Sequence, residues 1–315
     1  MDFISITIQF VLLIVGFVLL IKGSDFFVDG ASSVASILKI PTLIVGLTIV
    51  AFGTSAPEAA VSITSSLSGS NALALSNVIG SNLFNMLLII GLCALLNELK
   101  IGREVLNLDL PFLVILTGIL TAFILLGWNI SRIEGIILLI LIIAYVSYLV
   151  YNARKSKESQ IVEKPKMSFL RSIIYIVCGV AGIIIGADFV VDSASYIAMA
   201  FGMSETLVGL TIVAMGTSLP ELATSLAALK KDENQLIIGN VIGSNIFNIS
   251  LVLGASSAIS PIAINPNMLV DIVLMLGVTI LFFIFGKTQD KYDKKEGFIL
   301  VALFVAYMAF AILRN

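Results

Sequence analysis

Two segments of the sequence place a glutamate directly after a proline at the end of an apolar stretch. They read GLTIVAFGTSAPE, from Gly46 to Glu58, and GLTIVAMGTSLPE, from Gly209 to Glu221. Proline has no N–H to donate and its ring collides with the carbonyl four residues earlier, so we expect a broken or kinked helix near Gly53. The break releases backbone carbonyl oxygens close to a carboxylate.

Hydroxyl groups share the helix face of each glutamate. Thr54 lies four residues and Ser55 three residues before Glu58, and residues at these spacings are neighbours on a helix surface. The second segment repeats the spacing with Thr217, Ser218 and Glu221. Each segment is therefore predicted to gather hydroxyls, freed carbonyls and one carboxylate on one face.

A second pair of motifs follows these segments. They read NVIGSNLFN, from Asn77 to Asn85, and NVIGSNIFN, from Asn240 to Asn248. Serine and asparagine at four-residue spacing share a helix face, as Ser81 does with Asn85 and Ser244 with Asn248. One such pair in isolation is more typical of helix packing than of a ligand set. The duplication and the neighbouring glutamates favour a binding function.

All of these donors are hard oxygens, the ligands that Na⁺, Ca²⁺ and Mg²⁺ prefer, whereas Zn²⁺ or Cu⁺ would favour histidine or cysteine. The chain contains no histidine. Apart from Lys22, no lysine or arginine lies within the relevant apolar stretches to neutralise Glu58 and Glu221. Ionisable residues inside a membrane mark ion pathways by default, so the sequence predicts a cation pathway.

Composition identifies a membrane protein with many spans. Of the 315 residues, 59% are hydrophobic and 12% are charged, against roughly 25% charged in a soluble domain. We expect the lipid bilayer as its environment, no nucleic-acid partner and no soluble domain. Ten stretches approach the roughly 20 apolar residues that a span needs. These stretches are Ser5–Leu38, Pro41–Leu67, Ala72–Leu96, Leu108–Leu126, Ile133–Tyr151, Phe169–Phe201, Glu205–Leu229, Leu236–Ile259, Met268–Phe285 and Gly297–Leu313.

The chain is an internal duplication. A shift of 163 residues aligns the proline segments at eleven of thirteen positions and the asparagine motifs at eight of nine. Each copy holds five spans, an odd number, so the second copy enters the membrane from the opposite face, as in many secondary transporters. The sequence predicts an all-α membrane protein with ten transmembrane helices in two inverted five-helix repeats. The predicted parts are residues 1–152, a linker over 153–168 and the inverted repeat over 169–315.

The distribution of basic residues predicts the orientation. If the linker is cytoplasmic, fifteen lysines and arginines lie inside, whereas only Arg132 and Arg314 lie outside. Basic residues concentrate in cytoplasmic loops. We therefore expect a multi-pass protein of the cell membrane with both termini extracellular. The repeated pairs Asp25 with Asp29 and Asp188 with Asp192 lie toward span ends, where a structural or vestibule role is favoured.

The motifs GTSAPE and GTSLPE, each followed by a GSN helix, resemble the alpha repeats of the Ca²⁺/cation antiporter superfamily, and most closely its Na⁺/Ca²⁺ exchangers. The resemblance covers essentially the whole chain and implies ten spans in two inverted halves. It implies a central Ca²⁺ site at Glu58, Glu221 and the carbonyls near Thr54 and Thr217, with Asn85 and Asn248 beside the middle of the site. It further implies an outward Na⁺ site at Ala214, Thr217, Ser218 and Ser244, and an inward one at Ala51, Thr54, Ser55 and Ser81.

Function then follows from the resemblance as an expectation. The chain should be an antiporter and not an enzyme, exchanging Na⁺ for Ca²⁺ by alternating access, with three Na⁺ per Ca²⁺ and net charge movement. No cofactor, no protein partner and a monomer are expected. Asn248 replaces the aspartate of some K⁺-dependent relatives, which disfavours K⁺ dependence. The linker is too short for a regulatory domain, which favours a prokaryotic origin. H⁺/Ca²⁺ exchange, K⁺-dependent exchange and a cation channel remain alternatives.

Overall fold

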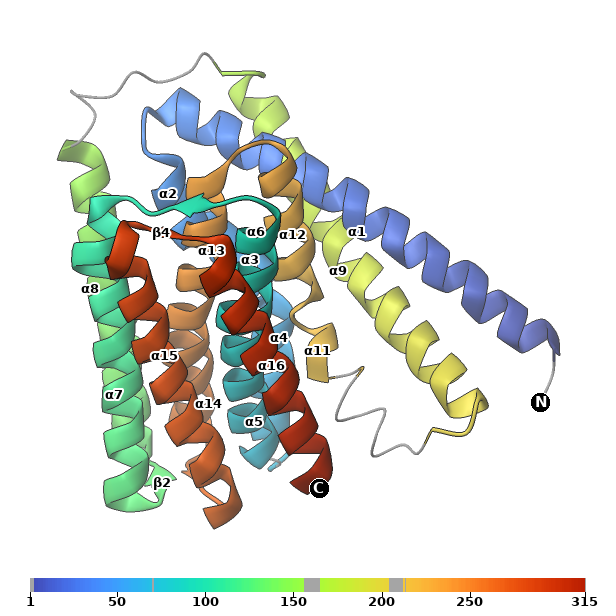
Figure 1. The fold of residues 1–315 in the computed structure, drawn as a ribbon, viewed down its shortest axis with the longest axis vertical. Helices are drawn as coiled ribbons and strands as arrows, with labels where there is room; N and C mark the ends of the chain where they lie inside the picture. Colours follow the sequence, from blue (N-terminus) through green and yellow to red (C-terminus); the bar gives the residue numbers. More distant parts are fainter. Residues whose placement is uncertain (1–2, 70, 156–164, 204–211, 213, 315) are drawn as a thin grey trace.

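The computed structural model describes residues 3–69, 71–155, 165–203, 212 and 214–314, and these ranges are almost entirely helical (Figure 1). Eight of the described helices are long and apolar enough to cross a membrane, and a bent pair over Thr42–Thr54 and Ala56–Leu67 makes nine. The prediction of an all-α membrane protein is confirmed. The predicted span Glu205–Leu229 lies partly outside the described ranges, so the tenth span stays a prediction.

The first half of the chain contains two short strands among its helices. Its elements are α1 (Phe3–Leu38), α2 (Thr42–Val45), η1 (Gly46–Val50), α3 (Ala51–Thr54), α4 (Ala56–Leu67), α5 (Asn71–Leu83), η2 (Phe84–Ile89), α6 (Ile90–Leu96), β1 (Leu99–Lys100), η3 (Val105–Asp109), α7 (Leu110–Gly127), β2 (Asn129–Ile130) and α8 (Arg132–Lys155).

The second half repeats this order over the residues that the structure describes. Its elements are α9 (Phe169–Ala200), α11 (Ala214–Gly216), α12 (Leu219–Lys230), α13 (Asn234–Phe247), η6 (Asn248–Val252), α14 (Leu253–Ile259), β3 (Ile262–Ala263), η7 (Pro266–Met268), α15 (Leu269–Gln289), β4 (Lys291–Tyr292) and α16 (Lys294–Arg314).

The two longest helices, α1 and α9, pack along each other and are inclined against the other helices (Figure 1). Glycines allow their backbones to come close. A Cβ atom on Gly23 would lie 2.8 Å from the Ile183 nitrogen, and one on Gly179 would lie 2.7 Å from the Phe27 nitrogen. At 36 and 32 residues, both helices are longer than a perpendicular span of about 20 residues needs, and their inclination accommodates the extra length.

The first proline segment bends the chain by 48° between α3 and α4. The bend lies at Ser55, two residues after the predicted position at Gly53. Pro57 is the second residue of α4, and the first turn of a helix tolerates proline because its N–H groups lack helical partners. The helix therefore restarts immediately before the proline. In the second repeat, α11 ends at Gly216 and α12 begins at Leu219.

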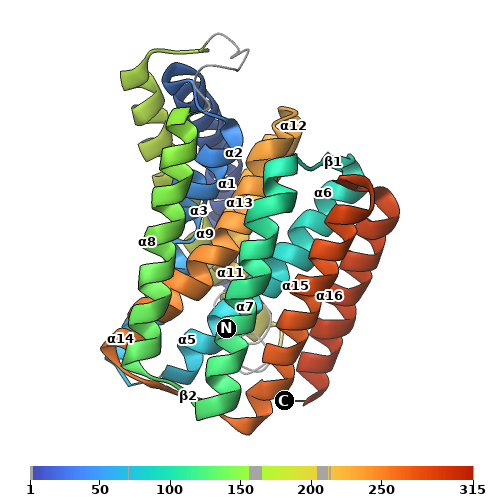
Figure 2. The ribbon, with the colours of Figure 1, turned by 90° about the vertical axis from the view of Figure 1, so that its left-hand side faces the viewer.

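Two short antiparallel ribbons join the halves. Strand β1 pairs with β4, and β2 pairs with β3. The repeat shift of 163 residues carries β1 onto β3 and the neighbourhood of β2 onto β4, so it exchanges the two ribbons. They lie at opposite ends of the molecule (Figure 2). Such an exchange agrees with an inverted relation between the halves.

The asparagine-motif helices occupy the centre of the molecule. In the most apolar 18-residue segment of each span, 78% is buried inside the protein for Ala72–Leu96 and 94% for Asn234–Ile259. The same share is only 22% for Lys294–Arg314. Helices α5 and α13 are therefore shielded from lipid by protein. Polar side chains on them are buried within the protein itself.

Candidate functional site

The two glutamates lie in the first turns of α4 and α12, directly after the breaks. Glu58 and Glu221 both have 0% exposed surface. The N-terminus of a helix carries partial positive charge and unpaired N–H groups, which favour a carboxylate there. The breaks thus place two acidic groups inside the protein.

Serines from both repeats contact each carboxylate. Ser81 donates to Oε1 of Glu58 at 3.4 Å, and Ser218 of the other repeat donates to the same atom at 3.1 Å. The arrangement at Glu221 is equivalent, with the two repeats exchanged. Its Oε1 accepts hydrogen bonds from Ser244 at 3.3 Å and from Ser55 at 2.9 Å. Each carboxylate is held by one serine of its own half and one of the other half.

The threonines also reach across the repeats. Thr54 donates to Oδ1 of Asn240 at 3.1 Å, and Thr217 donates to Oδ1 of Asn77 at 3.3 Å. The amide groups of these asparagines bind the backbone of the glutamates, with Asn77 3.4 Å from the Glu58 carbonyl and Asn240 3.5 Å from the Glu221 carbonyl. No role for Asn77 or Asn240 follows from the sequence spacing.

Asparagines of the two motifs bind each other across the centre. Asn85 donates to Oδ1 of Asn245 at 3.1 Å, and Asn248 donates to Oδ1 of Asn82 at 3.1 Å. Asn85 and Asn248 lie at the equivalent π-helical turns η2 and η6. Turns of this kind occur frequently at functional sites. Asn82 and Asn245 also belong to the duplicated motif, but their spacing predicts no role for them.

Four buried oxygens in this region have no hydrogen-bond partner among the described residues. They are Oε2 of Glu58, Oε2 of Glu221, Oδ1 of Asn85 and Oδ1 of Asn248. Buried polar groups are normally paired, and an uncompensated buried carboxylate is especially costly. All four atoms accept and none donates, so their chemistry fits a cation.

The donor set also indicates which cation. The described residues contain no cluster of three or more histidine, cysteine, aspartate or glutamate side chains that could hold a metal ion. A cation here would rely on two carboxylates supplemented by amide, hydroxyl and backbone oxygens. Na⁺ and Ca²⁺ accept such ligands, and Ca²⁺ takes six to eight oxygens.

The structure brings together most of the predicted site residues. A network of hydrogen bonds connects the two halves through Thr54, Ser55, Glu58 and Ser81 of the first and Thr217, Ser218, Glu221 and Ser244 of the second. Ala51 is buried and its carbonyl accepts the Ser55 N–H at 3.0 Å. Ala214 begins α11, and its side chain lies outside the described part. Ligation by these residues stays a prediction.

The repeated aspartates have unequal surroundings. Lys231 lies 3.0 Å from Asp29 and 3.9 Å from Asp25, and it donates to the Asp25 carbonyl at 2.7 Å. No such ion pair with Asp188 or Asp192 occurs among the described residues. The contacts of Asp25 and Asp29 agree with a structural role, since they fasten α1 to the end of α12.

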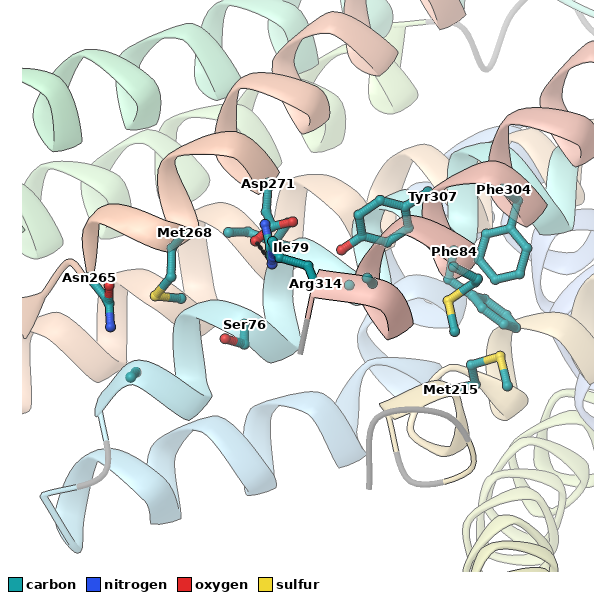
Figure 3. A pocket seen from close by; sticks show the side chains of 14 residues that line it. Ser76, Ile79, Phe84, Met215, Asn265, Met268, Asp271, Phe304, Tyr307 and Arg314 are labelled. Carbon is teal, nitrogen blue, oxygen red and sulfur yellow. Dashed lines mark hydrogen bonds and ion pairs between the residues drawn. The ribbon is translucent and has the colours of Figure 1, made fainter. Parts of the chain in front are cut away.

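Cavities lie toward both ends of the molecule. One of about 380 Å³ lies between α5, α15 and α16 and extends from Asn265 to Met215, two residues before Thr217 (Figure 3). The ion pair of Arg314 with Asp271, 2.7 Å long, lines it. A second cavity of about 340 Å³, at the end where β1 lies, is lined by residues of η1, η3 and α8.

Comparison with known proteins gives one consistent family. The family model described as sodium/calcium exchanger protein matches residues 8–151 and 171–313. The inner membrane protein YrbG of Escherichia coli is 37% identical, with 91% of this chain and 91% of that protein covered. The sodium/calcium exchanger MaX1 of Methanosarcina acetivorans is 31% identical, with 96% and 98% covered.

A solved structure agrees with these relatives. The sodium-calcium exchanger NCX_Mj, soaked with 10 mM Na⁺ and 10 mM Sr²⁺, superposes with a TM-score of 0.86 at 30% identity. The match covers 96% of this chain and 98% of that one. The likeness therefore extends over both halves of the molecule.

Proposed function

We propose that this chain, which belongs to the sodium/calcium exchanger family, is a secondary antiporter that exchanges Na⁺ for Ca²⁺ across a membrane. Members of this family are transporters and not enzymes. The observation that supports the proposal most directly is the set of four unpartnered acceptor oxygens at the meeting point of the repeats. Their number and charge suit one divalent ion or more than one monovalent ion.

Ca²⁺ would bind between Glu58 and Glu221, because a pair of carboxylates balances the charge of a divalent cation. Backbone carbonyls near Thr54 and Thr217 would complete the shell together with the oxygens of Asn85 and Asn248. The proposed outward Na⁺ site uses Ala214, Thr217, Ser218 and Ser244. The proposed inward Na⁺ site uses Ala51, Thr54, Ser55 and Ser81.

Transport would proceed by alternating access, in which one group of helices moves against another around a fixed site. The complete burial of Glu58 and Glu221 supports a state in which neither side of the membrane reaches them. The two cavities toward opposite ends of the molecule would be the entrances through which ions approach the site from the two sides of the membrane. A channel would need a continuous path instead.

We further propose exchange of three Na⁺ for one Ca²⁺. The carboxylates alone balance one Ca²⁺ or two Na⁺, and the duplicated hydroxyl and carbonyl sets provide oxygens for a third monovalent ion. The protein would lie in the cell membrane of a prokaryote as a monomer, with both termini outside. The relatives named above come from a bacterium and an archaeon.

The test is ⁴⁵Ca²⁺ uptake into proteoliposomes loaded in turn with Na⁺, with choline and with a pH gradient. We expect uptake only when Na⁺ is inside and its concentration falls outward. Uptake driven by the pH gradient alone would support H⁺/Ca²⁺ exchange instead. A requirement for K⁺ in the Na⁺-loaded vesicles would identify K⁺-dependent exchange, and fluxes well above a carrier's turnover would identify a channel.

A further inference from the structure

Two hydrogen-bonded asparagine pairs join the repeats beside the proposed ion site. Asn248 donates to Asn82 and Asn85 donates to Asn245, each over 3.1 Å. All four side chains are buried, with exposed fractions of 1% or less. The proposed function uses the oxygens of Asn85 and Asn248, but it gives no task to Asn82 and Asn245.

The orientation of these amides follows from their partners. A carboxamide has one accepting end and one donating end. The Nδ2 atom of Asn82 donates to the backbone carbonyl of Asn245 at 3.4 Å, and that bond leaves the Asn82 oxygen facing Asn248. Asn248 must then present its nitrogen to Asn82. Its own oxygen is consequently the end without a protein partner.

We propose that Asn82 and Asn245 are positioning residues that turn the carboxamide oxygens of Asn248 and Asn85 toward the transported cation. Each holds the NH₂ group of its partner on the far side, where its partial positive charge does not oppose the ion. The proposal rests on the exchange function given above. Each repeat thereby orients a ligand that belongs to the other repeat.

The two positioning asparagines differ in how firmly their own side chains are held. The amide nitrogen of Asn82 contacts the Asn245 carbonyl and lies 3.9 Å from the sulfur of Met275. The amide nitrogen of Asn245 has no hydrogen-bond partner among the described residues. Asn82 is therefore fixed more firmly, and Asn248 is the better oriented of the two ligands. Substitution of Asn82 should weaken Ca²⁺ binding more than the same substitution of Asn245.

A double-mutant cycle tests the orienting role. Asn82→Leu removes the acceptor at similar side-chain volume, and Asn248→Asp offers an oxygen whichever way the side chain turns. The four proteins of the cycle are compared by Na⁺-driven ⁴⁵Ca²⁺ uptake in proteoliposomes and by Ca²⁺-dependent thermal unfolding in detergent. With Asn248 present, we expect Asn82→Leu to raise the KM for Ca²⁺ about tenfold, as expected for one lost hydrogen-bonding interaction.

In the Asn248→Asp background, Asn82→Leu should change the KM for Ca²⁺ by less than about twofold, because an aspartate presents an oxygen in either orientation and no longer needs Asn82. The effects of the two substitutions are then not additive. The matched control combines Asn82→Leu with Asn85→Asp, because Asn85 pairs with Asn245. There the tenfold effect of Asn82→Leu should persist. An equal effect in all three backgrounds would show that Asn82 only supports the fold, and it would overturn the proposal.

A second comparison decides the matter if Asn248→Asp binds no Ca²⁺. Asn82→Asp keeps an oxygen facing Asn248, so it must retain the thermal stabilisation by Ca²⁺ that Asn82→Leu loses. Equal loss in both variants contradicts the proposal. If the wild type shows no Na⁺-driven Ca²⁺ uptake, the proposed exchange function itself is wrong. Failure of the exchange function can therefore be distinguished from failure of the orienting role.

Discussion

Among the described residues that hydrogen-bond within the site, Glu58 and Glu221 carry the only acidic side chains. If Ca²⁺ binds at the proposed site, Glu58→Gln or Glu221→Gln removes one of the two charges that would face the divalent ion in a poorly screened environment. We expect each variant to lose Ca²⁺ uptake by at least about a hundredfold, equivalent to about 2.8 kcal/mol or more. Proteoliposome ⁴⁵Ca²⁺ uptake measures the loss. Glu98→Gln is the matched control, because Glu98 is exposed and pairs with Lys291; near-normal uptake by either site variant would exclude that glutamate as a Ca²⁺ ligand.

Residue types and spacing predicted the serines and glutamates of the site but not all of its asparagines. The side chains of Ser55, Ser218 and both glutamates could be predicted to come together, because serine and glutamate three residues apart share a helix face and the duplication repeats this arrangement in each half. Asn82 is different, since its partner Asn248 lies 166 residues away in the sequence. Only the packing of α5 against the second repeat shows which end of that amide faces which neighbour.

Among the elements, α1 offers a contact whose loss should change transport more than stability. Lys231 ties α1 to the end of α12 through Asp29 and Asp25, and these groups are partly exposed. Lys231→Met should lower the free energy of unfolding by no more than about 1 kcal/mol, because such ion pairs are weakly stabilising. If α1 moves during exchange, the same variant should change the rate of ⁴⁵Ca²⁺ uptake severalfold.

The neighbouring Lys230→Met is the control for charge alone. Asp29→Asn should reproduce the effect of Lys231→Met, and the double variant should add little to either, since the two groups act as a pair. Additive effects would mean that the contact between α1 and α12 does not control the rate. Thermal unfolding in detergent separates a change in rate from a loss of folded protein.

Sequence patterns predicted the long helices well because lipid-facing helices are continuous apolar runs. They placed the break of the first proline segment two residues early, since Pro57 was expected to disrupt the preceding turn. The structure instead accommodates Pro57 in the first turn of α4. The π-helical turns at Asn85 and Asn248 have no comparable pattern, because an extra residue in a helical turn is set by tertiary packing.

For the whole molecule, the orientation in the membrane is a separate prediction. Basic residues place the end containing Lys230 inside and the end containing Asn129 outside. In a chain with Cys93 and Cys178 replaced by alanine, Lys230→Cys should react with an impermeant thiol reagent only from the cytoplasmic side. Asn129→Cys is its counterpart at the opposite ribbon and should react only from outside. The reverse pattern in sealed vesicles would invert the topology without affecting the fold.

Charge movement during exchange is also a property of the whole molecule, because it depends on the sum of the ions carried in both directions. Three Na⁺ against one Ca²⁺ moves one net positive charge per cycle, and that charge couples to the membrane potential at about 2.3 kcal/mol per 100 mV. An inside-negative potential should therefore drive Na⁺ inward and Ca²⁺ outward. In vesicles whose potential is set by K⁺ and valinomycin, the Na⁺ gradient that gives zero net Ca²⁺ flux should shift with voltage. Since two Na⁺ would balance the two carboxylates and carry no net charge, a voltage-independent null gradient would establish electroneutral exchange and remove the third Na⁺ from the mechanism.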